Sequence, residues 1–207
     1  MPDTEWREFE LYNTILDLIA RLSSRVFLGD KLCRNEDWLS ITKTYTVNGF
    51  ASCTALHEYP SSARHLMQWF VPGCKTVRQQ VELARRIVEP EVQRRRSLRE
   101  QARKEGKPEP RFNDSIDWFE EESGGKDYDA TGGQLGLSIV AIHTSTDLIV
   151  ETVLRILDYP GLLDAMRKEI VDVLGAEGWK KTSLTNLKLM DSVLKEAQRL
   201  KPATSGK

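Results

Sequence analysis

The sequence predicts an all-α protein, and three observations lead to this expectation. Nearly every periodic segment of the 207 residues has apolar side chains at helical spacing. Segments with the two-residue alternation of a half-buried strand are hard to find. The breaks between periodic segments contain glycine, proline and asparagine, which end helices and form turns. The chain is therefore expected to be one helical domain or part of one.

The first helix is expected at residues 10–27, and a turn at 28–35 separates it from the second. The second helix opens at Asn35 or Glu36 and loses its apolar pattern near His57. The inward face of the first helix should carry six apolar residues: Leu11, Ile15, Leu18, Ile19, Leu22 and Val26.

A long charged helix is expected from Lys75 to about Lys104, after a stretch (58–74) whose two prolines indicate a loop with a short helix. Pro90 should kink the long helix, because proline removes a backbone donor and clashes with the preceding turn. The inward face of this helix should carry Val77, Val81, Ala84, Val88 and Val92.

A surface linker then leads to a short acidic helix that Asn113 or Asp114 caps. After a glycine-rich loop, residues 134–157 predict a long helix that is the longest central element of the structure. Pro160 suits the first turn of the following helix, which should end at Gly175.

The last helix is expected at about 185–200. Its inward face should carry Leu187, Met190, Val193, Leu194 and Ala197.

Charge is balanced over the whole chain but not along it. The net charge is −1, which gives no sign of nucleic-acid binding. Residues 75–108 hold eleven basic and five acidic residues, whereas residues 109–130 hold two basic and eight acidic ones. We expect these two segments to form oppositely charged surfaces that lie near one another.

The cysteines and the N-terminus indicate the compartment. Cys33, Cys53 and Cys74 have no zinc-site spacing, and their odd number argues against a disulfide framework, so a reducing compartment fits. The N-terminus is polar and acidic, unlike a signal peptide.

The helix at 134–157 has the length of a membrane span but carries ionisable residues. These are His143, Asp147, Glu151 and Arg155, which make insertion into a bilayer costly. We therefore expect the central helix of a soluble domain and no membrane segment.

The middle of that helix is unusual, since "VAIHTSTD" (140–147) places a histidine and three hydroxyl residues in an apolar run. The hydroxyl of Thr144 can reach the carbonyl of Val140, which loosens or bends a helix. We expect the helix to be disturbed near Ala141–Ser145. In the last helix, Glu196 and Arg199 share a face at a spacing of three residues.

The order of these features resembles the cytochrome P450 monooxygenases, most closely the fungal group that includes ent-kaurene oxidases. The phrases that carry the resemblance are "RLSSRVFLGDKLCRNEDWL", "YTVNGF", "LSIVAIHTSTDL" and "LKLMDSVLKEAQRLKP". It covers the chain up to about Pro202 and corresponds to roughly helices E to K of that fold. It implies that residues 1–202 are the central helical portion of a single P450 domain and that 203–207 are a short tail.

The resemblance assigns roles to the residues in the middle of the long helix. In the family this helix crosses the distal face of the haem, and its threonine helps to deliver protons to iron-bound oxygen. Thr144 takes the threonine position and Ser145 the hydroxyl after it, while His143 replaces an acid and Ala141 a glycine. Thr144, Ser145 and His143 are the implied catalytic residues.

Two further sets of residues follow from the resemblance. Glu196 and Arg199 match the ExxR pair, which in the family is buried and bonded to a later segment. Phe50, Val140 and Ala141 would line the pocket on the distal side, where substrate binds.

The implied function is insertion of one oxygen atom of O₂ into an apolar, terpenoid-like secondary metabolite. The family uses haem, electrons from an NADPH–P450 reductase and, in full-length relatives, the endoplasmic reticulum membrane. Its cysteine loop, Phe-x-x-Gly-x-Arg/His-x-Cys-x-Gly after ExxR, is not found in these 207 residues, and Cys33 in "FLGDKLCRN" is only a partial match.

Because the cysteine loop is not found in the sequence, we expect no metal site in this chain. Alone it should be soluble, cytoplasmic and inactive. The alternatives are a catalytically inactive truncated remnant, a helical interaction piece, or an unrelated helical scaffold.

Overall fold

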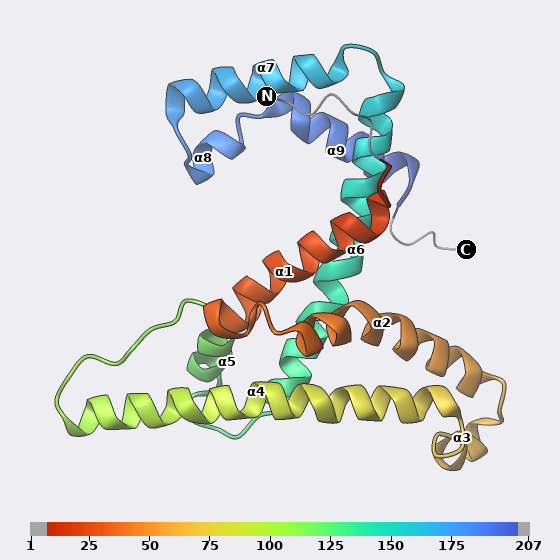
Figure 1. Ribbon diagram of the computed structural model, residues 1–207, viewed down its shortest axis with the longest axis vertical. Coiled ribbons are helices and arrows are strands. Elements are labelled where there is room, and N and C mark those ends of the chain that lie inside the picture. The colour runs from red at the N-terminus through yellow and green to blue at the C-terminus, as the bar shows by residue number, and fades with distance from the viewer. Residues whose placement is uncertain (1–7, 203–207) are drawn as a thin grey trace. The chain divides into compact units, whose positions relative to one another are not determined.

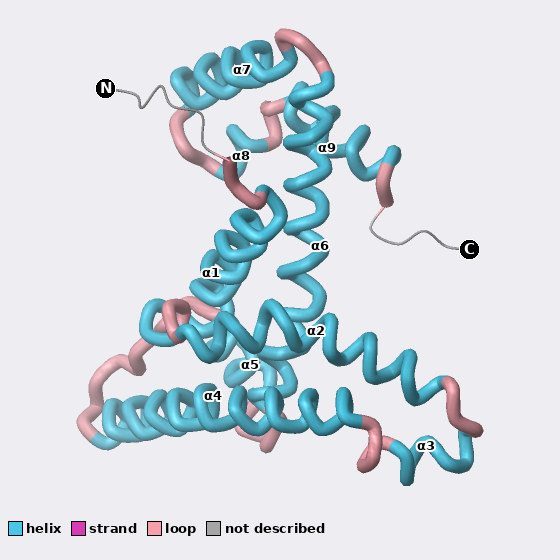
Figure 2. Tube along the Cα trace, turned by 45° about the vertical axis from the view of Figure 1, so that its right-hand side comes forward, coloured by secondary structure: helices cyan, strands magenta, loops and turns pink. Residues whose placement is uncertain are grey.

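The structure is a computed structural model that describes residues 8–202, and all regular secondary structure in this range is helical (Figure 2). The all-α prediction is confirmed. Residues 1–7 and the predicted tail at 203–207 lie outside the described residues. The helices are α1 (Leu11–Leu32), α2 (Glu36–His57), α3 (Ser61–Met67), α4 (Pro72–Lys104), α5 (Ser115–Ser123), α6 (Ala130–Asp158), α7 (Leu162–Glu177), α8 (Lys181–Leu184) and α9 (Lys188–Leu200) (Figure 1).

The chain divides into two compact units. The larger unit is Leu16–His143, and the smaller unit joins Met1–Ile15 to Thr144–Lys207. Helices α1 and α6 each contribute residues to both units. Each unit is described by itself below.

The helix boundaries follow from capping residues that the sequence shows. Asn35 accepts a hydrogen bond from the Trp38 amide at 2.8 Å and so caps α2. Asp114 accepts from the Asp117 amide at 3.2 Å and caps α5. Both caps agree with the prediction. Gly29 explains the expected turn between the first two helices, because its φ of 73° and ψ of −172° kink α1.

Two predicted boundaries of α7 are wrong. The helix continues past Gly175 to Glu177 and ends at Gly178, whose φ of 72° suits glycine. Pro160 lies before the N-cap, Gly161, and not in the first turn. The shift of the cap from Gly175 to Gly178 arises because two glycines near the end of a helix offer alternative caps.

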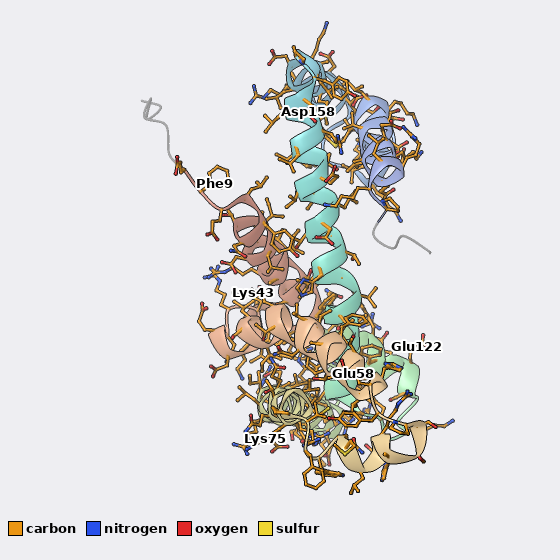
Figure 3. All side chains as sticks on the ribbon, turned by 90° about the vertical axis from the view of Figure 1, so that its right-hand side faces the viewer. Phe9, Lys43, Glu58, Lys75, Glu122 and Asp158 are labelled. Atoms are coloured by element: carbon orange, nitrogen blue, oxygen red, sulfur yellow. The ribbon has the colours of Figure 1, made fainter. Side chains whose placement is uncertain are left out.

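The core of the larger unit lies among α1, α2, α4, α5 and the first part of α6. Its α2 and α4 run side by side (Figures 1 and 2), and side chains fill the layer between them (Figure 3). Trp38 is fully buried, and its indole nitrogen donates to the Ser24 hydroxyl at 3.0 Å. The buried cluster comprises Leu28, Trp38, Ile41, Ala84, Val88, Val92, Ile116, Ala130 and Leu135.

The predicted inward face of α1 is partly wrong. Leu18, Leu22 and Val26 are about half exposed. The buried side instead carries Ala20 and Ser24, together with Ile19 and Leu28. The hydrogen bond from Trp38 to Ser24 explains the difference, because it turns the small residues of α1 toward the core.

Helix α4 is the longest helix among the described residues, as the expected span from Lys75 to about Lys104 implies. It has 33 residues and continues as one helix through Pro90, whose ring lies on the exposed side. Its buried residues include the predicted Ala84, Val88 and Val92.

Helix α6 has 29 residues and is uninterrupted, so the disturbance expected near Ala141–Ser145 does not take the form of a break. By length and apolar composition it could cross a membrane. The core helix of a soluble protein passes the same test, and its ionisable residues oppose insertion. The prediction of one long helix here is confirmed.

In the smaller unit, α7 supplies the N-terminal cap of α9. The Glu169 carboxylate accepts from the amides of Leu189 and Met190 at 2.6 and 3.0 Å. This contact satisfies two of the amides that the start of a helix leaves without intrahelical partners. Of the inward positions predicted for the last helix, Leu187 and Ala197 are buried and the others are partly buried.

Candidate functional site

A hollow of about 390 Å³ lies in the larger unit, within the size range of ligand pockets. We call it the α2–α4 hollow, because α2 and α4 supply most of its wall and α6 adds one residue. Its wall is mostly apolar, with a few polar groups. Its lining residues include Tyr45, Thr46, Phe50, Cys74, Arg78 and Ile139.

The predicted pocket residues fall differently around this hollow. Phe50 lines it, although its side chain is 66% exposed. Val140 is 68% exposed and Ala141 is partly buried, and neither lines the hollow. Ile139 lines it instead, because adjacent residues of a helix point in different directions.

A second hollow, of about 400 Å³, lies in the smaller unit and contains the predicted hydroxyl pair. We call it the α6–α9 hollow. Thr144 is exposed and Ser145 partly buried at its wall. Its lining residues are Thr144, Ser145, Asp147, Leu148, Gln198, Lys201 and Pro202.

His143 precedes the hydroxyl pair on α6 but does not line this hollow. Its ring is partly buried, and its Nε2 atom is buried without a hydrogen-bond partner among the described residues. The structure therefore brings Thr144 and Ser145 to one hollow and places His143 outside it.

Ionisable groups around the α6–α9 hollow are paired. Lys201 lies 3.3 Å from the buried carboxylate of Glu151, which Arg155 also binds at 2.7 Å. Burial alone would raise the pKa of Glu151, but these two cations outweigh it and lower the pKa. Burial and the Asp147 carboxylate raise the pKa of the Tyr12 hydroxyl, which stays protonated.

The predicted ExxR pair forms in α9. The Arg199 guanidinium donates to both carboxylate oxygens of Glu196, at 2.7 and 2.6 Å. These hydrogen bonds lower the pKa of Glu196 and raise that of Arg199. Both side chains are more than half exposed, and in the described part of the chain neither has another ion-pair partner. The pair is thus exposed here, whereas the resemblance implied a buried one.

Sequence reasoning missed a buried cluster centred on Arg95, which we call the Arg95 cluster. Arg95 is 2% exposed and binds both oxygens of Asp114 at 2.7 Å and Glu91 at 2.9 Å. Asp117 lies 3.4 Å away and is also buried. Arg95 follows the buried Val88 and Val92 of α4 at helical spacing, so it lies on the same side of the helix. This spacing could have indicated from the sequence that Arg95 is buried.

The opposite charges of residues 75–108 and 109–130 do meet, as predicted. Arg96 binds Glu120 at 2.7 Å. Arg103 binds Glu109 at 2.6 Å. The basic side of α4 is thereby neutralised along α5 and the linker before it.

None of the three cysteines is among the residues that line the α6–α9 hollow. Cys33 is buried and donates to the Asp30 carbonyl at 3.3 Å, and Cys53 and Cys74 line the α2–α4 hollow. The α6–α9 hollow offers hydroxyl, carboxylate, amide and ammonium groups but no sulfur. Among residues 8–202 no three His, Cys, Asp or Glu side chains gather as a metal site would require. This donor set does not fit an iron–thiolate centre.

The chain is similar to a group of fungal enzymes. The cytochrome P450 family model matches residues 9–206. Cytochrome P450 monooxygenase esdpI of Penicillium shearii is 46% identical over 98% of this chain, which covers 39% of that protein. Cytochrome P450 monooxygenase eqxH of Fusarium heterosporum is also 46% identical over 98% of this chain, which covers 39% of that protein. Cytochrome P450 monooxygenase adrA of Penicillium rubens is 42% identical over 99% of this chain and 40% of its own length. The chain thus spans about two fifths of these relatives.

Proposed function

The chain belongs to the cytochrome P450 family, and on that premise we propose that residues 1–202 are the central helical portion of a haem-thiolate monooxygenase domain. The enzyme inserts one atom of O₂ into an apolar, terpenoid-like secondary metabolite. Its partners are a small-molecule substrate and an NADPH–P450 reductase, and its location is the endoplasmic reticulum membrane. The names of the fungal relatives support this activity.

One observation carries the proposal, namely that Thr144 and Ser145, which are consecutive residues of α6, both line the α6–α9 hollow. A hydroxyl both donates and accepts hydrogen bonds, so two adjacent ones can hold water and pass protons. His143 immediately precedes Thr144 in α6, and imidazole is a common proton-transfer group. We assign these three residues to proton delivery.

The α2–α4 hollow is the proposed substrate pocket, with Phe50 and Ile139 in its wall. Its mostly apolar wall supports an apolar substrate. Haem, when bound, supplies the oxygen chemistry in this family. We propose no ligand for its iron among the described residues, and the role of this chain is confined to substrate binding and proton transfer.

The test uses the haem-loaded enzyme with its reductase and ent-kaurene as the probe. We expect an oxygenated product, and Thr144→Ala should reduce product per NADPH by about tenfold or more, because a general acid typically contributes at least that much. Thr152→Ala is the matched control, since Thr152 lies on the same helix with its hydroxyl bonded to the Leu148 carbonyl at 2.6 Å.

Thr152→Ala should leave the yield per NADPH unchanged. Equal losses in the two variants would contradict the assignment of Thr144. Absence of any oxygenated product from ent-kaurene and other apolar terpenes would contradict the proposed activity.

A further inference from the structure

Arg78 differs from every other arginine of α4. Each of the others lies within 4.0 Å of a carboxylate, whereas Arg78 has no ion-pair partner among the described residues. Arg78 is nevertheless one of the residues that line the α2–α4 hollow. The arginines of α4 that are paired are Arg85, Arg86, Arg94, Arg95, Arg96, Arg99 and Arg103.

Two contacts hold the Arg78 guanidinium. One terminal nitrogen donates to the Gln68 carbonyl at 2.9 Å. The guanidinium carbon lies 4.5 Å from the centre of the Trp69 ring. The other terminal nitrogen and Nε remain as donors, and this edge of a guanidinium matches the two oxygens of a carboxylate. The cation is thus positioned without a counter-ion among residues 8–202.

Thr46 is a second exception in the same wall. Two other threonines of α2 bond back to a carbonyl of the preceding turn, Thr44 to Ser40 at 2.8 Å and Thr54 to Phe50 at 3.0 Å. The Thr46 oxygen is buried and has no hydrogen-bond partner in the described part of the chain. Buried polar groups without partners are uncommon in folded proteins and require an explanation.

We propose that the α2–α4 hollow binds an apolar monocarboxylic acid, whose carboxylate is held by Arg78 and Thr46. Arg78 supplies the opposite charge, and the Thr46 hydroxyl, rotated about χ1 into the hollow, donates to a carboxylate oxygen. The apolar wall, with Phe50 and Ile139, covers the body of the ligand. As a statement about the substrate class, this inference rests on the proposed function.

The test compares decanoic acid with methyl decanoate by isothermal titration calorimetry on the protein, below the concentrations at which either aggregates. The acid should bind at least about tenfold more tightly than the ester, because only the acid forms a charge-assisted pair. Arg78→Gln should abolish this preference, and Arg78→Lys should restore part of it. Thr46→Val should weaken binding of the acid about three- to tenfold, which corresponds to one hydrogen bond.

Matched controls come from the same helices. Arg86→Gln removes an exposed arginine of α4 that pairs with Glu82 and does not line this hollow. Thr44→Val removes a neighbouring hydroxyl of α2 that also lies outside its wall. Neither variant should change the ratio of acid to ester affinity.

Cysteine alkylation gives the position of the ligand. Cys53 and Cys74 line the hollow and Cys33 does not, so decanoic acid should slow alkylation of the first two and leave Cys33 unchanged. Mass spectrometry of the labelled peptides measures the rates. Slowing at all three cysteines, or at none, would contradict the proposed site.

Equal affinities for acid and ester, no binding of the acid, or an unchanged preference in Arg78→Gln would overturn the inference. In that case Arg78 is a solvated cation and Thr46 an unsatisfied hydroxyl. The binding assay needs no haem or reductase, so its result is independent of the product assay. Oxygenated product together with equal affinities would reject the acid-binding site alone.

Discussion

The Arg95 cluster and the Glu196–Arg199 pair use the same chemical groups in opposite surroundings. Arg95 and its carboxylates Glu91 and Asp114 are each at most 3% exposed, and they join α4 to the start of α5. Glu196 and Arg199 are more than half exposed, and both lie on α9. Water can replace either partner of the exposed pair but none in the cluster. Burial, and not the pairing itself, therefore determines how much each group of charges contributes to the free energy of unfolding.

The largest expected effect is that of Arg95→Met. It leaves Glu91, Asp114 and Asp117 buried without their shared cation, so the free energy of unfolding should fall by about 3–5 kcal/mol. Urea denaturation followed by tryptophan fluorescence measures the change, because Trp38 lies in the same core. A loss below about 1 kcal/mol, the range of exposed pairs, would remove the contrast between the two regions.

The pH dependence of stability should follow from Glu91. Burial alone would raise the pKa of Glu91, but hydrogen bonds from Arg94, Arg95 and Lys31 outweigh it and lower the pKa from 4.5 to about 2. The unfolded chain therefore takes up this proton first. The contribution of Glu91 is complete above about pH 4.5 and is lost as the pH falls toward 2, and it amounts to roughly 3 kcal/mol.

Denaturation at a series of pH values measures this loss. Glu91→Gln should flatten the slope between pH 4.5 and 2, whereas Glu196→Gln should change it much less because Glu196 is exposed. An unchanged slope in Glu91→Gln would mean that other carboxylates cause the acid sensitivity.

A smaller effect is expected from Gly29→Ala, which tests how closely the backbone of α1 approaches the Arg95 cluster. The φ of 73° and ψ of −172° belong to a region that only glycine adopts readily, and a Cβ there would collide with the Asp114 carboxylate. We expect a loss of about 2 kcal/mol in the free energy of unfolding.

Gly106→Ala is the control for this substitution. Gly106 also has a positive φ, 65°, but no atom lies within 4 Å of the added Cβ. It should cost about 1 kcal/mol, the usual penalty for a left-handed residue with a side chain. Equal losses for the two variants would show that the contact with Asp114 contributes nothing.

The smallest effect is expected from Arg199→Met. Loss of this exposed pair should change the free energy of unfolding by less than about 1 kcal/mol, and added salt should reduce the change further. Urea denaturation at low and high salt measures both. A loss above about 2 kcal/mol would mean that α9 is covered in solution by a surface that buries Glu196.

Helix positions were predictable because each helix has its own periodicity and caps. Asn35 and Asp114 were found in this way. The buried side of α1 was not, because its contact with the core runs through Ala20 and Ser24, which hydropathy does not mark. Which side of a helix is buried depends on the helices that pack against it. The sequence of that helix alone does not specify them.

The candidate sites were predictable only where the chain itself brings residues together. Thr144 and Ser145 are adjacent on α6, so their joint position follows from the sequence and the resemblance. The α2–α4 hollow joins Phe50 to Ile139, which only the tertiary fold brings together. Among the described residues Arg78 has no ion-pair partner and the Thr46 hydroxyl has no hydrogen-bond partner, and both facts are visible only in three dimensions.

The capping of α9 by Glu169 has a consequence for sequence variation among descendants of this chain. The partners of the carboxylate are the backbone amides of Leu189 and Met190, which every residue except proline provides. Substitutions at 189 and 190 can therefore drift without loss of the contact, while position 169 must keep a long side chain with an accepting oxygen. Covariation between these positions should be weak although they are in contact, and a contact map inferred from paired substitutions would miss the link between α7 and α9.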